Sequence, residues 1–164
     1  MGTKVIVDGD IIGHSTLTKL RQVLTELDDT FAKDISKTIV SAFPNNISLK
    51  SHRLLCSIDG FAIGICSGHI DGLYSKLFNA YSLFKENTVH SLILIAKSSK
   101  EAWWKNQEGR IRNGKEMNSS LGNRQNWGLV KSGIKSSSHW FDMPITGLIL
   151  ERDISVDGYN QFKW

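Results

Sequence analysis

Apolar side chains recur at steps of three and four in the first part of the chain, which is the spacing of one face of a helix. Ser15 precedes the first of them as a candidate N-cap, and Pro44 follows the last. The pattern therefore predicts one long amphipathic helix of about seven turns. Its apolar face consists of Leu17, Leu20, Leu24, Leu27, Phe31, Ile35, Ile39 and Phe43.

Short apolar runs predict four strands, and a second helix falls between the third and the fourth. The second and third runs, Arg53–Ile58 and Phe61–Cys66, are separated only by Asp59-Gly60. An Asp-Gly link between two such runs predicts a tight hairpin. The first and fourth strands are expected at Lys4–Val7 and Val89–Ala96. The apolar stripe of the second helix consists of Leu73, Leu77, Ala80, Tyr81 and Phe84.

The order strand, helix, strand, strand, helix, strand is that of a ferredoxin-like fold. We therefore expect an α/β (α+β) protein with a β-α-β-β-α-β core in residues 1–108 and both helices on one face of the sheet. Residues 109–164 are expected to be a C-terminal extension of a basic loop and short strands, at His139–Met143 and Ile145–Leu150. Since no second-domain boundary is visible, residues 1–164 are predicted to be a single domain.

The composition, with 40% apolar and 22% charged residues, is that of a globular protein. The longest apolar runs, such as Ser91–Ala96, are too short to cross a bilayer, so no membrane partner is expected. The N-terminus lacks the features of a secretory signal, and a cytoplasmic location is expected by default. Cys56 and Cys66 lie in apolar, strand-like surroundings and are predicted to be reduced, buried thiols.

The net charge of +4 is concentrated between Lys105 and Lys135, a segment that contains seven basic residues and two acidic ones. Positive charge follows a phosphate backbone, and bases stack on aromatic rings such as those of Trp103, Trp104 and Trp127 in or beside this segment. The segment therefore predicts contact with a nucleotide or a nucleic acid, and the alternative is a solvated loop beside core tryptophans. The predicted phosphate-binding residues are Lys105, Arg110, Arg112, Lys115 and Arg124.

Three carboxylates are expected at one edge of the predicted sheet. Asp8 and Asp10 follow the first strand, and Asp59 lies in the hairpin that the predicted topology brings to the same edge. Carboxylates that converge repel one another, and a divalent cation such as Mg²⁺ or Mn²⁺ removes that cost. Asp8, Asp10 and Asp59 are therefore candidate metal ligands. The alternative is a set of plain turns, because Asp-Gly occurs four times in the chain.

These features together resemble a known family over roughly residues 4–110. The acidic turn after the first strand, the long helix and the acidic hairpin are similar to the palm domain of nucleotidyl cyclases and minimal CRISPR polymerases. The resemblance implies that Asp8 and Asp59 hold the metal ions. The hairpin departs from the family's Gly-Gly-Asp-Asp element, because Ser57 and Ile58 replace its two glycines and Gly60 replaces its second acid.

Two functions follow from this interpretation. The first is a binding module, such as a palm that has lost catalysis, which takes a nucleotide, a nucleic acid, a protein or a second copy of itself. The second is a Mg²⁺-dependent nucleotidyl transferase or cyclase that acts on nucleoside triphosphates. A nuclease of the Asp…Glu-x-Lys type, with Asp59 as its first acid and Lys97 as its lysine, is a weaker alternative, because Ile95 stands where the second acid would be.

Overall fold

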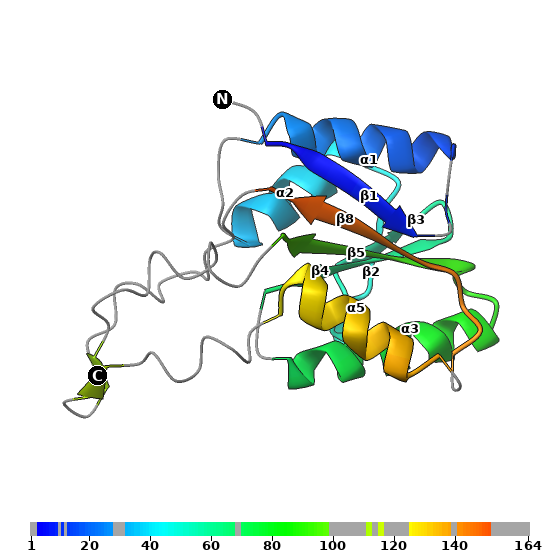
Figure 1. The fold of residues 1–164 in the computed structure, drawn as a ribbon. Coiled ribbons are helices and arrows are strands. Elements are labelled where there is room, and N and C mark those ends of the chain that lie inside the picture. The colour runs from blue at the N-terminus through cyan, green and yellow to red at the C-terminus, as the bar shows by residue number, and fades with distance from the viewer. Residues whose placement is uncertain are drawn as a thin grey trace.

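The computed structural model consists of a six-stranded mixed sheet between two layers of helices, together with a separate two-stranded sheet (Figure 1). It describes residues 3–9, 11, 13–27, 32–67, 70–98, 111–112, 115–116, 125–138 and 141–151. The strands are β1 Val5–Gly9, β2 Ile47–Ser48, β3 Cys56–Ile58, β4 Phe61–Cys66, β5 Ser91–Lys97, β6 Ile111–Arg112, β7 Lys115–Glu116 and β8 Ile145–Leu150. The helices are α1 Ser15–Thr25, α2 Ala32–Ala42, the 3-10 turn η1 Lys50–His52, α3 Asp71–Lys85 and α5 Trp127–Ser136.

The sheet has the order β1-β8-β5-β4-β3-β2. Strands β4, β5 and β8 are parallel, whereas β1 and β3 run antiparallel to their neighbours. Every residue of β5 is buried, as expected for a parallel strand covered on both faces. We call the side of the sheet where β4, β5 and β8 end the carboxyl edge, and the side where they begin the amino edge.

Each face of the sheet packs against its own pair of helices. Helices α1 and α2 cover one face, where Leu20 and Ile39 contact Ile93 and Leu148 in one apolar cluster. Helices α3 and α5 cover the other face, where the second cluster forms around Leu77, Leu94 and Val130. Figure 1 shows the two pairs on opposite sides of the strands. The alternation of side chains along each strand supplies both clusters at once.

The α/β class predicted from the sequence is confirmed, but the ferredoxin-like strand order is wrong. β4 and β5 pair in parallel, and β8 lies between β5 and β1. The predicted extension at residues 109–164 therefore contributes a central strand, and helices cover both faces instead of one. An apolar run shows that a strand is buried and does not show which strand it pairs with.

The long helix predicted from Leu17 to Phe43 consists of two helices. Helix α1 ends at Thr25 and α2 begins at Ala32. Leu20, Leu24, Ile35 and Ile39 are all fully buried in the same cluster, as the periodicity predicts. Both helices face the same side of the sheet, and so the three-to-four spacing of apolar residues continues from one to the next.

The predicted hairpin is confirmed. β3 and β4 pair antiparallel with Ile58 opposite Phe61, which leaves Asp59-Gly60 as a two-residue turn. Both residues have positive φ angles, +50° for Asp59 and +84° for Gly60. Positive φ at both central positions matches the right-handed twist of the flanking strands, and Asp-Gly adopts it at low cost.

The two cysteines are free and fully buried, as predicted. Burial raises the pKa of Cys56 and of Cys66 to about 11, because the apolar surroundings penalise the thiolate. Within the described part of the chain, the helices are all too short or too polar to cross a membrane.

The turn gives the first test of the fold. A Cβ on Gly60 would lie 2.5 Å from the His90 ring, whereas a Cβ on Gly13, which also has a positive φ of +72°, has no atom within 4 Å. Both Gly→Ala variants should lose about 1–2 kcal/mol from the left-handed backbone. Gly60→Ala should lose about 1–3 kcal/mol more through the clash. Chemical denaturation measures both losses, and equal losses would contradict the packing of His90 on the turn.

Candidate functional site

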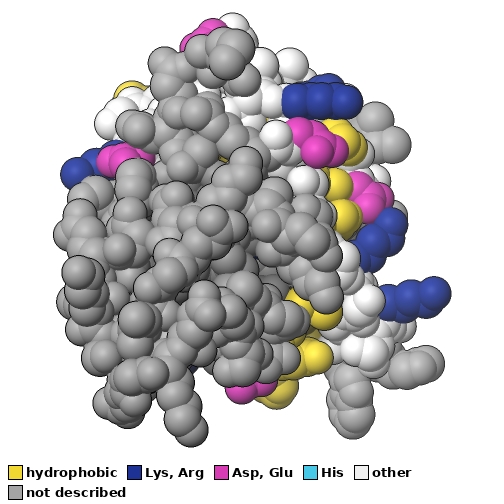
Figure 2. Space-filling model, turned by 60° about the vertical axis from the view of Figure 1, so that its left-hand side comes forward, with side chains coloured by type: hydrophobic (Ala, Val, Ile, Leu, Met, Phe, Trp, Pro, Cys, Tyr) yellow, Lys and Arg dark blue, Asp and Glu magenta, His cyan; other side chains and the backbone are white. Residues whose placement is uncertain are grey.

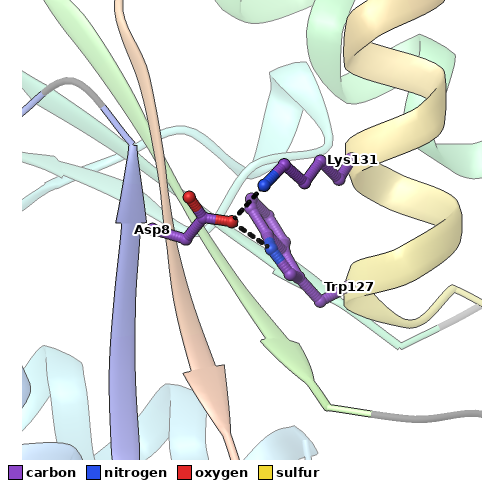
Figure 3. A network of polar contacts seen from close by, with 3 residues as sticks. All are labelled: Asp8, Trp127 and Lys131. Atoms are coloured by element: carbon purple, nitrogen blue, oxygen red, sulfur yellow. Dashed lines mark hydrogen bonds and ion pairs between the residues drawn. The ribbon is translucent and has the colours of Figure 1, made fainter.

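Asp8 joins the first strand to the last helix through one carboxylate oxygen. The indole Nε1 of Trp127 and the ammonium of Lys131 each donate a hydrogen bond to Asp8 Oδ2 at 2.8 Å. Figure 3 shows both side chains reaching from α5 toward β1. The Asp8 side chain is 36% exposed and that of Lys131 is 63% exposed, so solvent screens this ion pair.

The register of the sheet explains why Trp127 reaches this position. Asp8 pairs with Gly147 of β8. A Cβ on Gly147 would lie 2.2 Å from the Trp127 ring, so the ring lies directly on the strand where there is no side chain. Asn126 caps α5 by accepting a hydrogen bond from the backbone N–H of Leu129. The start of α5 is therefore fixed by a cap, an aromatic contact and a hydrogen bond.

These contacts lower the pKa of Asp8. The hydrogen bond from Lys131 is the largest cause and the hydrogen bond from Trp127 the second, while partial burial opposes them. Because the folded-state pKa lies below the unfolded one, the contribution to stability is complete above the unfolded pKa, at about pH 4. It is lost as the pH falls through the lower folded-state pKa.

Asp59 has a different environment, inside the hairpin turn. Its two carboxylate oxygens accept hydrogen bonds from Thr16 Oγ1 at 2.7 Å and from Asn45 Nδ2 at 2.9 Å. The backbone N–H of His90 donates to the carbonyl of Gly60 at 2.8 Å. Asp59 thus ties the hairpin to the start of α1 and to the segment after α2.

The structure does not bring Asp8 and Asp59 together. β8 and β5 lie between their strands, and three strand spacings amount to about 14 Å. These two carboxylates therefore do not fit one shared cation. Among the described residues, no group of three or more His, Cys, Asp or Glu side chains is arranged to hold a metal ion. Asp10, the third predicted ligand, lies outside the described residues.

The Asp…x-Lys pair considered for a nuclease is also separated. Lys97 is fully buried at the carboxyl edge, where β5 ends, whereas Asp59 precedes β4 at the amino edge. Six residue steps along β5 amount to about 20 Å. These two residues therefore do not belong to one site.

The predicted phosphate-binding residues are only partly described. Arg112 of β6 and Lys115 of β7 are register partners in the two-stranded sheet. Lys105, Arg110 and Arg124 lie outside the described residues. In the view of Figure 2, Lys and Arg side chains lie beside acidic and hydrophobic ones along the right-hand side.

The carboxyl edge is where the structure gathers features that suit an anion. Helices α3 and α5 both begin there, since α3 follows β4 and Gln125 lies against Gly72 at 3.3 Å from its ideal Cβ. Helix N-termini carry partial positive charge. The Lys76 ammonium lies 3.8 Å from the same ideal Cβ, close enough to the Cys66 thiol to oppose the rise in its pKa. In the sequence, most of the basic residues of segment 105–135 lie between the end of β5 at Lys97 and the start of α5 at Trp127.

Sequence reasoning missed both α5 and Lys76. Trp127, Val130 and Ile134 have helical spacing behind the Asn126 cap, but Gly128 and Gly133 lie among them and lower the helix propensity. Lys76 lies on a helix whose polar face is expected to carry lysines, so the sequence does not distinguish it. The asparagine before an apolar triad was a signal that could have identified α5.

Comparison with known proteins supports the fold. No family model matches the chain, and no curated protein matches it. Among solved structures the chain is similar to the crystal structure of restriction endonuclease BGLII complexed with a DNA 16-mer. The TM-score is 0.63 at 11% sequence identity, covering 94% of this chain and 78% of that chain. At this identity the likeness shows a shared α/β fold.

The Asp8 network gives the second test. Asp8→Ala leaves the Trp127 indole without its acceptor and should lose about 1–3 kcal/mol of unfolding free energy. Asp8→Asn keeps an acceptor and loses only the ion pair, so the loss should be below about 1 kcal/mol.

Denaturant unfolding at several pH values measures both variants. The difference in unfolding free energy between wild type and Asp8→Asn should reach its full value above about pH 4. It should vanish at lower pH, as the Asp8 carboxylate is protonated. If Asp8→Ala is as stable as Asp8→Asn, the hydrogen bond to Trp127 contributes nothing and the network is not an anchor.

Proposed function

We propose that this protein is a nucleic-acid-binding module that holds the phosphate backbone at the carboxyl edge of its sheet. The proposal assigns Lys76, the starts of α3 and α5 and the basic segment before α5 to one binding surface. It assigns binding and no reaction. The observation that carries it is that both helix starts and Lys76 lie at the carboxyl edge, where β5 ends before the basic segment and α5 begins after it.

General physical chemistry supports this choice of edge. In open α/β sheets, ligands bind beyond the carboxyl ends of the parallel strands. Backbone N–H groups at helix N-termini point toward an anion there and the helix dipole favours it. In the sequence before α5, five basic residues and two acidic ones lie between Lys105 and Arg124, and positive charge follows a phosphate backbone.

The fold supports the same function. One solved structure with a similar fold is that of a restriction endonuclease complexed with DNA, and the likeness extends over 94% of this chain. The charge of this chain, with a pI of about 9.1, suits such a partner at neutral pH.

The Mg²⁺ or Mn²⁺ predicted from Asp8, Asp10 and Asp59 is a separate hypothesis, for which the geometry of Asp8 and Asp59 gives no support. Binding through lysine and backbone N–H groups requires no cation. Titrations in Mg²⁺ and in a chelator therefore separate the two hypotheses. Tighter binding or product formation only with the metal would favour the metal site.

Binding of labelled DNA at several salt concentrations tests the proposal. Wild type should bind at low salt, and the affinity should fall with a linear slope in the logarithm of the salt concentration. Lys76→Gln should weaken binding and reduce that slope by about one phosphate contact. Lys76→Arg should restore both, since it keeps the charge.

Lys37→Gln is the matched control, because it removes the same charge from the exposed side of α2 on the opposite face. It should change neither affinity nor slope. Absence of binding at low salt, or equal losses in Lys76→Gln and Lys37→Gln, would overturn the proposed surface. Thermal unfolding of each variant shows that the fold is kept.

A further inference from the structure

An aromatic hollow lies beside α3, and two of its rings, Tyr81 and Phe141, also pack against the second core cluster. Tyr74, Phe78, Tyr81, Ser137 and Phe141 line a space of about 460 Å³. Phe78 is 70% exposed and Tyr74 is 45% exposed. Large apolar side chains are rarely left in water together on one helix, and a cluster of them marks a surface that binds something.

Contacts with Phe141 and with helix α5 hold the rings of this hollow in place. Phe141 packs edge-to-face against Tyr81 with ring centroids 4.9 Å apart, and against Phe78 at 6.1 Å. The Tyr74 hydroxyl lies 3.7 Å from the ideal Cβ of Gly133, an ordinary packing distance, so Tyr74 packs against α5. These contacts fix the rings of the hollow, which reduces the entropy lost on binding.

Positive charge lies at both ends of the aromatic row. Arg53 lines a second hollow, of about 500 Å³, together with Tyr74, Phe78 and Asn79. At the other end, the Lys85 ammonium lies 5.2 Å from the centroid of the Tyr81 ring. Tyr74 and Lys85 are eleven residues apart, which is about 16 Å along the helix. The strip thus has Arg53 beside its exposed rings, and at its other end Lys85, which also pairs with Asp142 at 3.5 Å.

We propose that this strip binds an unpaired stretch of nucleic acid, with bases stacked on Phe78 and Tyr74 and a phosphate beside Arg53. This inference rests on the proposed function and makes it more specific, because it assigns single strands as the preferred partner. Stacking accepts any base, since every base has a π face, and the flanking cations follow the backbone. A purely apolar peptide offers no group that pairs with the Arg53 guanidinium, whereas a nucleic acid offers phosphates. The charge of Arg53 therefore favours nucleic acid.

The strip lies on α3, the helix that also carries Lys76. Tyr74 follows Gly72 by two residues, and Lys76 belongs to the same turn of α3. Because residues two apart on a helix do not face each other, Lys76 projects from another side of α3 than Tyr74 and Phe78, and the strip is a separate contact surface on this helix. A paired duplex keeps its bases stacked inside and offers no face to these rings, which is why the two forms should bind differently.

Affinities for labelled single strands of about a dozen nucleotides and for the matching duplex test the inference. Wild type should bind the single strand more tightly, and Phe78→Ala should lose about five- to a hundredfold for the single strand only. Phe78→Trp should bind as well as wild type, whereas Phe78→Leu should behave as Phe78→Ala, because it keeps apolar bulk without a ring to stack. Ile47→Ala is the control, since Ile47 is 67% exposed on the edge strand β2.

Photocrosslinking of a single strand that carries iodouracil gives an independent readout, with adducts expected at Phe78 or Tyr74. If wild type binds both forms equally and Phe78→Ala changes neither, the stacking strip is overturned while nucleic-acid binding stands. If wild type binds neither form, the proposed function itself fails. A self-association that Phe78→Ala abolishes, without strand binding, would instead identify the strip as an interface between copies.

Discussion

The position of α5 depends on the contact between the Trp127 ring and Gly147. A side chain at residue 147 would occupy the space of the ring, so this one glycine lets the indole lie on the sheet. From there the indole N–H reaches Asp8 on the neighbouring strand at 2.8 Å. The contact fixes the start of α5, which follows the basic segment in the sequence. Both the carboxyl-edge surface and the floor of the aromatic hollow depend on this placement.

The two edges of the sheet have different roles. At the amino edge, the Asp59 carboxylate stabilises the fold around the turn, because Thr16 and Asn45 donate hydrogen bonds to its two oxygens. At the carboxyl edge, two helices begin and Lys76 lies beside Gly72. The acidic residues that a sequence search finds first therefore stabilise the fold. The proposed binding surface lies at the other end of the parallel strands.

Local features of the fold were predictable from the sequence, and long-range pairing was not. The Asp59-Gly60 hairpin follows from the conformational freedom of two residues, and the buried faces follow from periodicity. The position of β8 between β1 and β5 does not, because its apolar run resembles that of any buried strand. The break between α1 and α2 is not visible in the periodicity, because the leucines and isoleucines of both helices pack into the same cluster.

The candidate site was harder to predict for the same reason. Asp8 was identified, but its partners Trp127 and Lys131 are more than a hundred residues away in the chain. Lys76 and Phe78 lie on α3, and the sequence predicts only the apolar face of this helix. Only the packing of α3 against α5 shows that one side chain faces the carboxyl edge and that the other stays in solvent.

Backbone amide NMR of the wild-type protein during titration with an unpaired oligonucleotide tests the central claim most directly. The claim predicts that shift changes concentrate in the first turns of α3 and α5, including Gly72, Lys76 and Phe78. The Asp59-Gly60 hairpin at the amino edge should remain unchanged. Shift changes centred on that hairpin, or none along α3, would contradict the account.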